Sequence, residues 1–545
     1  MAHTRVIYQN EAVFVGPSPS ASGHYKYVSG AWTSGATPTQ KLLQLDPLAD
    51  QTVSTNVVGG KITLGEMRSG LRPNSVNLDR IQSVNYNFGI TRKDVNQYGN
   101  LAAIDRIILE QPSVQLNFSY IQNGLKNEDE MGLDIRVLKR PAIITFSTNA
   151  TTGISSVSIV DGGQSYIGTG FVNTLLASTT NGVLSLAVAT GGPYAGQVTG
   201  VTIATAGVGI TSTATGVAIK PSYTHTNIDI NTGFSNNNVY TPALTANIAD
   251  GTTSLLIVTC ISGISAGTSD DNNIFVRTVG QGNDVSVANS GTVDQQIIGF
   301  GNTVITNYTV EGAVGEFPKV TVDNEAFNMN FITGGCDYLQ STTRYPLPSV
   351  DNQGTRINGT FALNDFNDRS NVQNYIAAFR PGGIILDLSA YASSNSLGVD
   401  TSLGSINAQK FTISFDLKRE PLRKLGSTYY YAKTITFPIS YTVSVDALVS
   451  ELITGNLSNF ITVDNSYDLS ISYVKPGTET SPFGRLTGIR YLFKGAKLSS
   501  QDFSSQIGSN KTVTLKFDGQ IGGAQDLTKG MFINGDYFMY APELI

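Results

Sequence analysis

Apolar and polar residues alternate along much of this chain, which is the pattern of strands with one buried face. Between residues 84 and 90, Val84, Tyr86 and Phe88 fall on one side of such a strand, and Asn85 and Asn87 fall on the other. The same alternation recurs further along the chain. One face of each strand is therefore expected to pack on a core, while the other meets water or another surface.

Two pairs of similar segments indicate that part of the sequence is duplicated. FGNTVITNYTVEGA (300–313) aligns without a gap with FGRLTGIRYLFKGA (483–496). A second pair agrees at five equally spaced positions, which are Tyr86, Phe88, Ile90, Arg92 and Gly99 in one copy and Ile413, Phe415, Leu417, Arg419 and Gly426 in the other. A proline, Pro112 or Pro438, then opens a new alternating run in each copy. The pattern predicts two copies of one β-rich domain, which is typical of a pseudo-symmetric building block.

The first copy is interrupted by a long insertion. The stretch from Gly99 to Phe300 is far longer than that from Gly426 to Phe483. Within 141–285 charges are sparse, and short apolar runs end repeatedly in glycine turns. The predicted domains are therefore 1–140 joined with 286–332, an inserted β module at 141–285, and a second copy at 333–545.

Composition supports an all-β fold with few helices. Charged residues make up 14% of the chain, against roughly 25% in soluble globular proteins. Glycine, serine, threonine and asparagine take their place, which suits strands and tight turns. The best helix candidate is Asp368–Phe379, and Ala447–Leu452 is a shorter one. The expected fold is two tandem β-sandwich or barrel domains, each with a small helix, plus the inserted all-β module.

Charge and cysteine content exclude several classes of protein. A net charge of −6 argues against a large nucleic-acid-binding face, which needs clustered lysine and arginine. Cys260 and Cys336 provide neither a disulfide framework nor a zinc cluster. The apolar run around Leu255–Val258 is too short for a membrane helix and reads as a buried strand, and residues 1–30 lack a signal-peptide pattern.

Candidate chemical sites are weak. His3, His24 and His225 lie far from one another and from the cysteines in sequence. Three acidic stretches are candidates for a metal or catalytic site. Asp270–Asn273 lacks the spacing of a calcium loop and reads as a solvated turn, Asp161–Gln164 lacks the period of a calcium β-roll, and Glu128–Glu130 reads as an exposed acidic turn. No phosphate-binding loop or serine-nucleophile elbow occurs in the sequence. The sequence therefore predicts no cofactor, no metal site and no enzyme activity.

Distributed motifs resemble the major tail tube proteins of long-tailed bacteriophages. They are LDRIQSVNYNF (78–88), RKDVNQYG (92–99), AAIDR (102–106) and GEFP (315–318) with the strand that follows it. The resemblance covers residues 60–135 and 300–332 well. It covers the second copy more loosely, because Glu420-Pro421-Leu422 replaces Lys93-Asp94-Val95 there.

The resemblance implies tail-tube-type domains, six of which close a ring. Rings of that family stack around a central channel, and a long hairpin loop reaches into the neighbouring ring. In this chain the loop would be 92–106 in the first copy and 419–432 in the second. Three chains with two fused domains each would complete the ring, and the inserted module would decorate the outer wall.

These expectations assign roles to two sets of residues. The polar strand faces would line the channel through Asn85, Asn87, Gln115, Asn117, Ser119, Thr412, Ser414, Asp416, Ser440, Thr442 and Ser444. The stacking loop of the first copy would use Arg92, Lys93, Asp94, Asn96, Gln97, Tyr98, Asp105 and Arg106. An amide and hydroxyl wall with few cations would repel phosphate mildly, so that double-stranded DNA slides without binding.

The predicted function is that of a structural virion protein, assembled in the bacterial cytoplasm, without membrane insertion. Its partners would be further copies of itself, in trimeric rings, and the tape-measure, terminator and baseplate proteins of a phage tail. One alternative is a terminator or baseplate ring component. Another is a glycan-binding fibre, although Trp32 is the only tryptophan available to stack on a sugar. A bacterial adhesin is disfavoured by the lack of a signal-peptide pattern.

Overall fold

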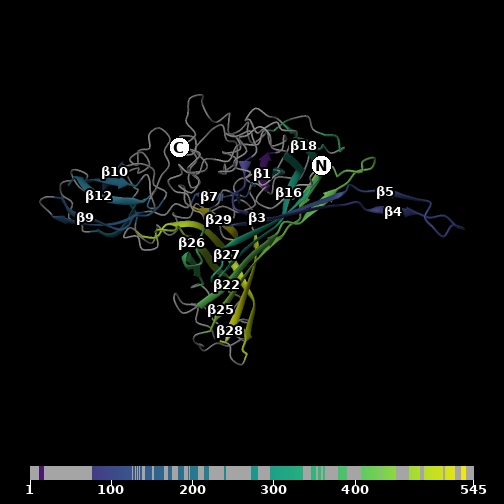
Figure 1. Ribbon diagram of the computed structural model, residues 1–545. Coiled ribbons are helices and arrows are strands. Elements are labelled where there is room, and N and C mark those ends of the chain that lie inside the picture. Colours follow the sequence, from purple (N-terminus) through teal and green to yellow (C-terminus); the bar gives the residue numbers. More distant parts are fainter. Residues whose placement is uncertain are drawn as a thin grey trace.

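The described part of the chain is built almost entirely of strands (Figure 1). The computed structural model describes residues 11–17, 76–124, 295–334, 378–388, 407–430, 432–449, 465–478, 484–506, 510–521 and 529–535, with shorter stretches between 127 and 279 and between 345 and 361. Among these residues, Pro381–Gly383 form a 3-10 turn and Asn127 and Glu128 are helical. The predicted all-β class is confirmed.

Eight strands follow one another side by side in the largest sheet. In order they are β3 (Ile81–Gly89), β6 (Ser113–Ile121), β17 (Lys319–Ala326), β16 (Gln295–Ala313), β22 (Asn407–Asp416), β25 (Ile439–Leu448), β28 (Thr512–Ile521) and β27 (Thr487–Ser504). The first four belong to the first copy and the last four to the second. The strand order of the first copy is repeated in the second, and the two sets join where β16 pairs with β22. We call this array the assembly sheet.

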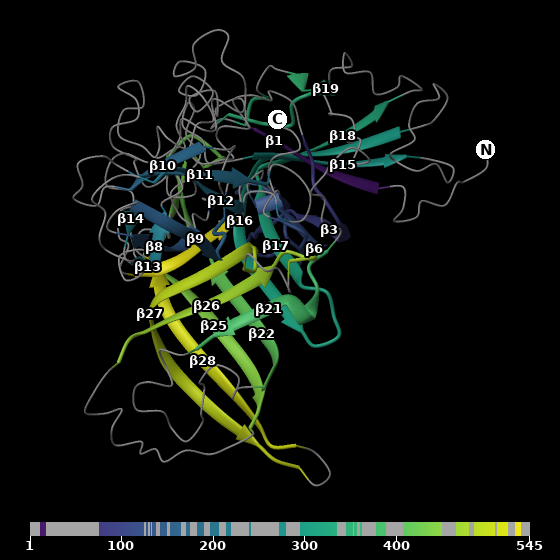
Figure 2. The ribbon, with the colours of Figure 1, turned by 90° about the vertical axis from the view of Figure 1, so that its left-hand side faces the viewer.

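The strands β16 and β27 are long enough to pass from the assembly sheet into a second layer. The first half of β16 pairs with β15 (Asn272–Val279) and β18 (Asn328–Gly334), and β15 continues to β1 (Glu11–Pro17) and β2 (Val76–Asn77). The first half of β27 pairs with β26 (Tyr467–Val474) and β29 (Gly530–Gly535), which lead to β21 (Ile384–Asp387) and β7 (Ile135–Val137). In Figure 2, β26 and the start of β27 cross over β22 and β25.

The structure confirms the predicted correspondence between residues 86–99 of the first copy and 413–426 of the second. The hairpin of β4 (Arg92–Val95) and β5 (Asp105–Ile108) follows β3 as the hairpin of β23 (Arg419–Leu422) and β24 (Ala432–Ile435) follows β22. Near the tips, Gly99 and Gly426 have φ of 88° and 84°, a conformation that glycine adopts without strain. Position by position, Tyr86 corresponds to Ile413 and Phe88 to Phe415.

The downstream alignment of 300–313 with 483–496 is out of register. Tyr308 pairs with Val322 of β17. The residue of β28 that corresponds to Val322 is Leu515, and it pairs with Gln501. The counterpart of Tyr308 in the second copy is therefore Gln501. Tyr491 lies instead in the first half of β27, opposite Ile471 and Ile533. A shared β-bulge fixes the correct register, since the pairing shifts between Ile305 and Asn307 in β16 and between Leu498 and Ser500 in β27.

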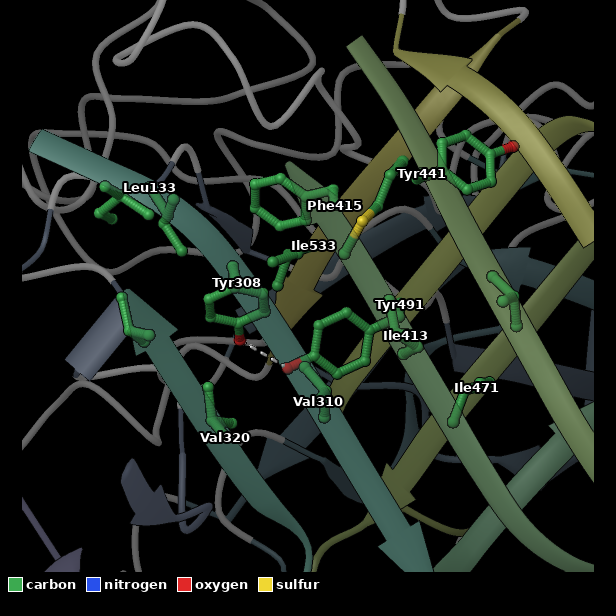
Figure 3. Close-up of a cluster of buried hydrophobic side chains, with 14 of the residues drawn as sticks. Leu133, Tyr308, Val310, Val320, Ile413, Phe415, Tyr441, Ile471, Tyr491 and Ile533 are labelled. Carbon is green, nitrogen blue, oxygen red and sulfur yellow. Dashed lines mark hydrogen bonds between the residues drawn. The ribbon is translucent and has the colours of Figure 1, made fainter. Parts of the chain in front are cut away.

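One core joins both copies. Tyr308 of β16 stacks on Phe415 of β22 at 5.3 Å between ring centroids. The second layer covers them with Tyr491, and Tyr473 meets that ring edge-on at 6.1 Å. Figure 3 shows Tyr308 and Tyr491 pointing toward each other between the strands. The two copies therefore fold around a common interior, and a large buried aromatic content stabilises the junction between them.

The inserted segment forms small sheets of its own. One contains β8 (Ala142–Asn149), β9 (Gly153–Asp161), β13 (Ala214–Ile219) and β14 (Val239–Tyr240), and the other contains β10 (Gly170–Thr174), β11 (Gly182–Val188) and β12 (Val198–Thr205). A further pair is β19 (Tyr345–Pro346) with β20 (Thr360–Phe361). The strand β15 lies within the predicted insertion but pairs with β1 and β16. The predicted domain limits otherwise stay a prediction.

Three local expectations have different outcomes. The helix at Ala447–Leu452 is wrong at its start, because Ala447 and Leu448 continue the alternation of β25 and pair with β28. Most of the helix at Asp368–Phe379, like the run around Leu255–Val258, lies outside the described residues. Tyr86 and Phe88 were expected on a buried face, yet both are exposed, because β3 is an edge of the assembly sheet.

Candidate assembly surface

The residues predicted to line a channel all lie on one face of the assembly sheet. Asn85 is opposite Asn117 and Asn87 is opposite Gln115 in the β3–β6 ladder. The same face continues across the junction of the copies, where Thr309 is opposite Ser414. The remaining predicted residues follow in register, namely Ser119, Thr412, Asp416, Ser440, Thr442 and Ser444. We call this the polar face; its channel role stays a prediction.

Cross-strand hydrogen bonds order the side chains of the polar face. Ser83 and Ser119 share one at 2.6 Å, and Thr309 donates to Ser414 at 3.3 Å across the junction of the copies. Asn117 donates to Asp323. Farther along, Thr514 donates to Asp446 at 2.6 Å. These bonds satisfy part of the hydrogen-bonding capacity of the face and hold its side chains in place.

Carboxylates exceed amines on the polar face. The strand registers put the following acidic side chains there: Glu311, Asp323, Glu325, Asp416, Asp446, Asp502 and Asp518. The basic ones are Lys319, Lys410, Lys497 and Lys516. Sequence reasoning named only Asp416 among these charges, although alternation along β17 and β28 carries the same signal for Asp323 and Asp518.

Both ends of the assembly sheet are unpaired among the described residues. Beyond β3, no described strand continues the sheet, and none pairs with the outer side of β27 from Lys497 to Ser504. The apolar residues of these edges are exposed, with Phe88 at 58% and Phe503 at 45%. Their counterparts at the internal junction, Phe415 and Val310, are buried. Open edges with apolar side chains are strong templates for pairing.

The first hairpin projects away from the body of the molecule (Figure 1). The predicted loop residues lie in it as follows: Arg92, Lys93 and Asp94 in β4, Asn96, Gln97 and Tyr98 toward the tip, and Asp105 and Arg106 in β5. Arg106 donates to Asp94 at 2.7 Å, which raises the pKa of Arg106. Tyr98 and Leu101 are fully exposed. Exposed apolar side chains along the hairpin, such as Ile107, and at its tip suit insertion into a partner, but that role stays a prediction.

The second hairpin packs against the first copy instead. Arg423 forms a bidentate ion pair with Glu110, at 2.8 and 3.0 Å, and lies over the Tyr430 ring. Lys433 is buried, forms an ion pair with Glu325 and lies 5.3 Å from the centre of the Phe327 ring. Burial lowers the pKa of Lys433, while Glu325 acts in the opposite direction. Sequence reasoning missed these contacts, since the partners are far apart in the chain.

A buried carboxyl group lies where the two copies meet. Glu128 is fully buried and accepts hydrogen bonds from Tyr120 at 2.7 Å and Tyr308 at 3.0 Å. Tyr308 also shares a hydrogen bond with Tyr491 at 3.1 Å, which brings in the second copy. Burial raises the pKa of Glu128 to about 7, although the hydrogen bonds act to lower it. The expectation of an exposed acidic turn at Glu128 is therefore wrong, because a local charge pattern does not reveal burial.

The other candidate chemical residues give no site in the described residues. No group of three histidine, cysteine or acidic side chains comes together there. Asp161 accepts a hydrogen bond from the Gly163 amide at 2.7 Å. Asn272 and Asn273 belong to β15, so the predicted turn does not extend to them. His3, His24, His225, Cys260, Cys336, Asp270, Asp271 and Trp32 lie outside the described residues. None of the described helices is long and apolar enough to cross a membrane.

The inserted segment is attached to the second layer. Gln164 makes two hydrogen bonds with the backbone of Thr487, at 3.1 and 3.2 Å. Gln197 donates to the carbonyl oxygen of Gly484 at 2.9 Å. Both glutamine residues are buried. These contacts fix the inserted sheets next to the start of β27, in the layer that covers the apolar side of the assembly sheet.

Comparison with known proteins adds little. No protein-family model matches the chain, and no curated protein matches it. Among solved structures, it is similar to a chain of the anti-feeding prophage baseplate, determined by cryo-EM with six-fold symmetry, at 12% sequence identity. That match covers 28% of this chain and 89% of the other, with a TM-score of 0.17. A TM-score this low carries no argument about function.

Proposed function

We propose that this protein is a structural subunit that assembles with copies of itself into closed rings, which stack into a tail tube. One observation carries the proposal. The assembly sheet consists of two equivalent four-strand units, and no described strand pairs with its two outer edges, which match its internal junction. Adding a second copy at each end repeats a contact that the chain already makes, until the ring closes.

Ring closure would solve the problem that the open edges create. Unpaired strand edges invite uncontrolled pairing, and a closed array of strands has no edges. The nine residues of β3 include no charged residue and no proline, and apolar Tyr86 and Phe88 are exposed there. An edge of this kind is consistent with a surface that is covered in the assembled state.

In such a ring the polar face would line the channel. Its hydroxyl and amide groups bind one another, and its carboxylates exceed its amines, so a DNA phosphate backbone would be repelled weakly. Double-stranded DNA would then pass without being held. A channel mapped to Lys- and Arg-rich surface, or to the face that carries Val84, Tyr86 and Phe88, would contradict this assignment.

The inserted sheets would lie outside the ring. They contact the start of β27 through Gln164 and Gln197, and this part of β27 belongs to the layer on the apolar side of the assembly sheet. That side is opposite the polar face. The proposed location is the phage virion, after assembly in the bacterial cytoplasm, with tape-measure, terminator and baseplate proteins as further partners. The proposal assigns no catalytic role.

The purified full-length protein should form rings or tubes with a central channel in negative-stain electron micrographs. Native mass spectrometry of a single ring should give the mass of three chains, because each chain supplies two equivalent units. Six chains in a ring, or a protein that stays monomeric at high concentration, would contradict the proposal. Rings that never stack would instead favour a terminator or baseplate component.

Deleting residues 94–104 should leave rings that do not elongate. The deletion removes the exposed hairpin end, including Tyr98 and Leu101, and touches no buried residue of the described core. Tube length in micrographs is the measurement. A milder variant, Tyr98→Ser with Leu101→Ser, should shorten the tubes, while Phe331→Ser, at an exposed residue outside the hairpin, should not. Tubes of normal length after the deletion would exclude a stacking role.

A further inference from the structure

The internal junction of the assembly sheet provides a template for contact between chains. Residues Asn307–Glu311 of β16 pair antiparallel with Thr412–Asp416 of β22. By the register of the repeat, the corresponding residues are Ser500–Ser504 on the outer edge of β27 and Asn85–Gly89 on the outer edge of β3. The bulges in β16 and β27 leave no freedom to shift this correspondence.

We infer that Ser500–Ser504 of one chain pairs with Asn85–Gly89 of the next, in the register of the internal junction. This inference rests on the proposed ring and specifies which strands meet and how. Phe503 then lies opposite Tyr86, as Val310 lies opposite Ile413. Gln501 lies opposite Phe88, as Tyr308 lies opposite Phe415. The template residues are all buried, so the same contact would cover the exposed aromatic rings of both edges.

Charge complementarity appears at a position that was not used to set the register. At the internal junction, Lys433 of the second hairpin forms an ion pair with Glu325 of β17. The corresponding residues are Arg106 of the first hairpin and Asp518 of β28. The repeat therefore brings a cation of one chain to a carboxylate of the next, as it does inside the chain. An unrelated register would have no reason to match the signs.

Arg106 would exchange one partner for another on assembly. In the single chain it pairs with Asp94, and both side chains are largely exposed. Exposed ion pairs of this kind contribute little to stability, so the exchange costs little. The residue that corresponds to Asp94 in the second hairpin is Pro421, opposite Lys433. Lys433 accordingly has no carboxylate opposite it in its own hairpin, and it pairs with Glu325 across the junction.

Cysteine cross-linking tests the register directly. In a background with Cys260→Ser and Cys336→Ser, the variant Asn85→Cys with Ser504→Cys should form a ladder of covalently linked chains on mild oxidation. The template pair is Glu311 opposite Thr412, and directly opposite residues of antiparallel strands lie within disulfide reach. The control Asn87→Cys with Ser504→Cys is shifted by two residues and should give at most a small fraction of that yield.

The outcomes separate the inference from the proposed function. Both cysteine variants could form rings while only the shifted control cross-links, or while neither variant cross-links. Either result would overturn the register and leave ring assembly intact. A cysteine-free background that makes no rings, when the native chain makes none either, would overturn both. If only the cysteine-free background fails to assemble, the charge variants below decide the question in the native background.

Charge reversal gives an independent reading of the same contact. In the inferred junction, position 518 faces Arg106 of the next chain, so Asp518→Lys puts two cations together. This variant should raise about fivefold the protein concentration at which half of the chains are assembled. Adding Arg106→Glu should restore assembly, whereas Asp94→Asn alone should leave it unchanged. Failure of the double variant to recover, with both single variants folded, would overturn the ion pair that the register requires.

Discussion

Replacing Phe88 with aspartate should leave the chain folded but unable to form rings. Phe88 is 58% exposed in the single chain, so the substitution removes little from its core. In the inferred junction it occupies the place of Phe415, which is 1% exposed. Burying a carboxylate there in place of the phenyl group would weaken each junction by roughly 3 kcal/mol or more. This loss raises the protein concentration needed for assembly about 100-fold.

The same substitution at the equivalent internal position provides a matched comparison. Phe415→Asp should destabilise the fold by at least about 3 kcal/mol, since the charge enters the core beside Tyr308. Phe331→Asp, at an exposed residue of β18, should affect neither folding nor assembly. Circular dichroism melts and sizing by light scattering measure the two effects. Normal assembly of Phe88→Asp would show that the β3 edge is not an interface.

Raising the pH from 4.5 to 7 should destabilise the fold through Glu128 by about 3 kcal/mol. The pKa of this carboxyl group is about 7 in the folded chain and near 4.5 when exposed. The folded state therefore holds the proton more tightly than the unfolded state. The stabilisation is fully present below pH 4.5, is lost progressively up to pH 7, and is constant above that. Tyr120 and Tyr308 do not titrate in this range, because burial raises the pKa of both.

Glu128→Gln isolates this contribution from the titration of other carboxylates. The amide keeps an oxygen that can accept from Tyr120 and Tyr308, but it does not ionise. The difference in unfolding free energy between the variant and the native chain should change by about 3 kcal/mol between pH 4 and pH 8, in favour of the variant at the higher pH. Chemical denaturation at several pH values measures it, and parallel stability curves would rule out a raised pKa at Glu128.

The sequence by itself determined the strand character of the chain and half of its repeat. Alternation placed Asn85, Asn117 and Ser414 on a common polar face, because side chains in a strand point to opposite sides with a period of two. The equal spacing of the β3 and β22 segments through the hairpin to Gly99 and Gly426 predicted the register that the structure shows. Local rules suffice where both the strand and its turn are encoded in one continuous stretch.

Only the tertiary structure decided which similar segments correspond and which residues are buried. A tyrosine followed by GA recurs in β16 and β27, but Tyr308 and Tyr491 lie in different layers and meet within the core. Glu128 looks like part of an acidic turn until the fold buries it and brings the distant Tyr308 within hydrogen-bonding distance of it. Tyr86 and Phe88 have the pattern of a buried strand and remain exposed at the sheet edge. Burial and pairing depend on segments hundreds of residues away, so no local pattern records them. That β3 is an edge among the described strands is recognised only once the sheet is built.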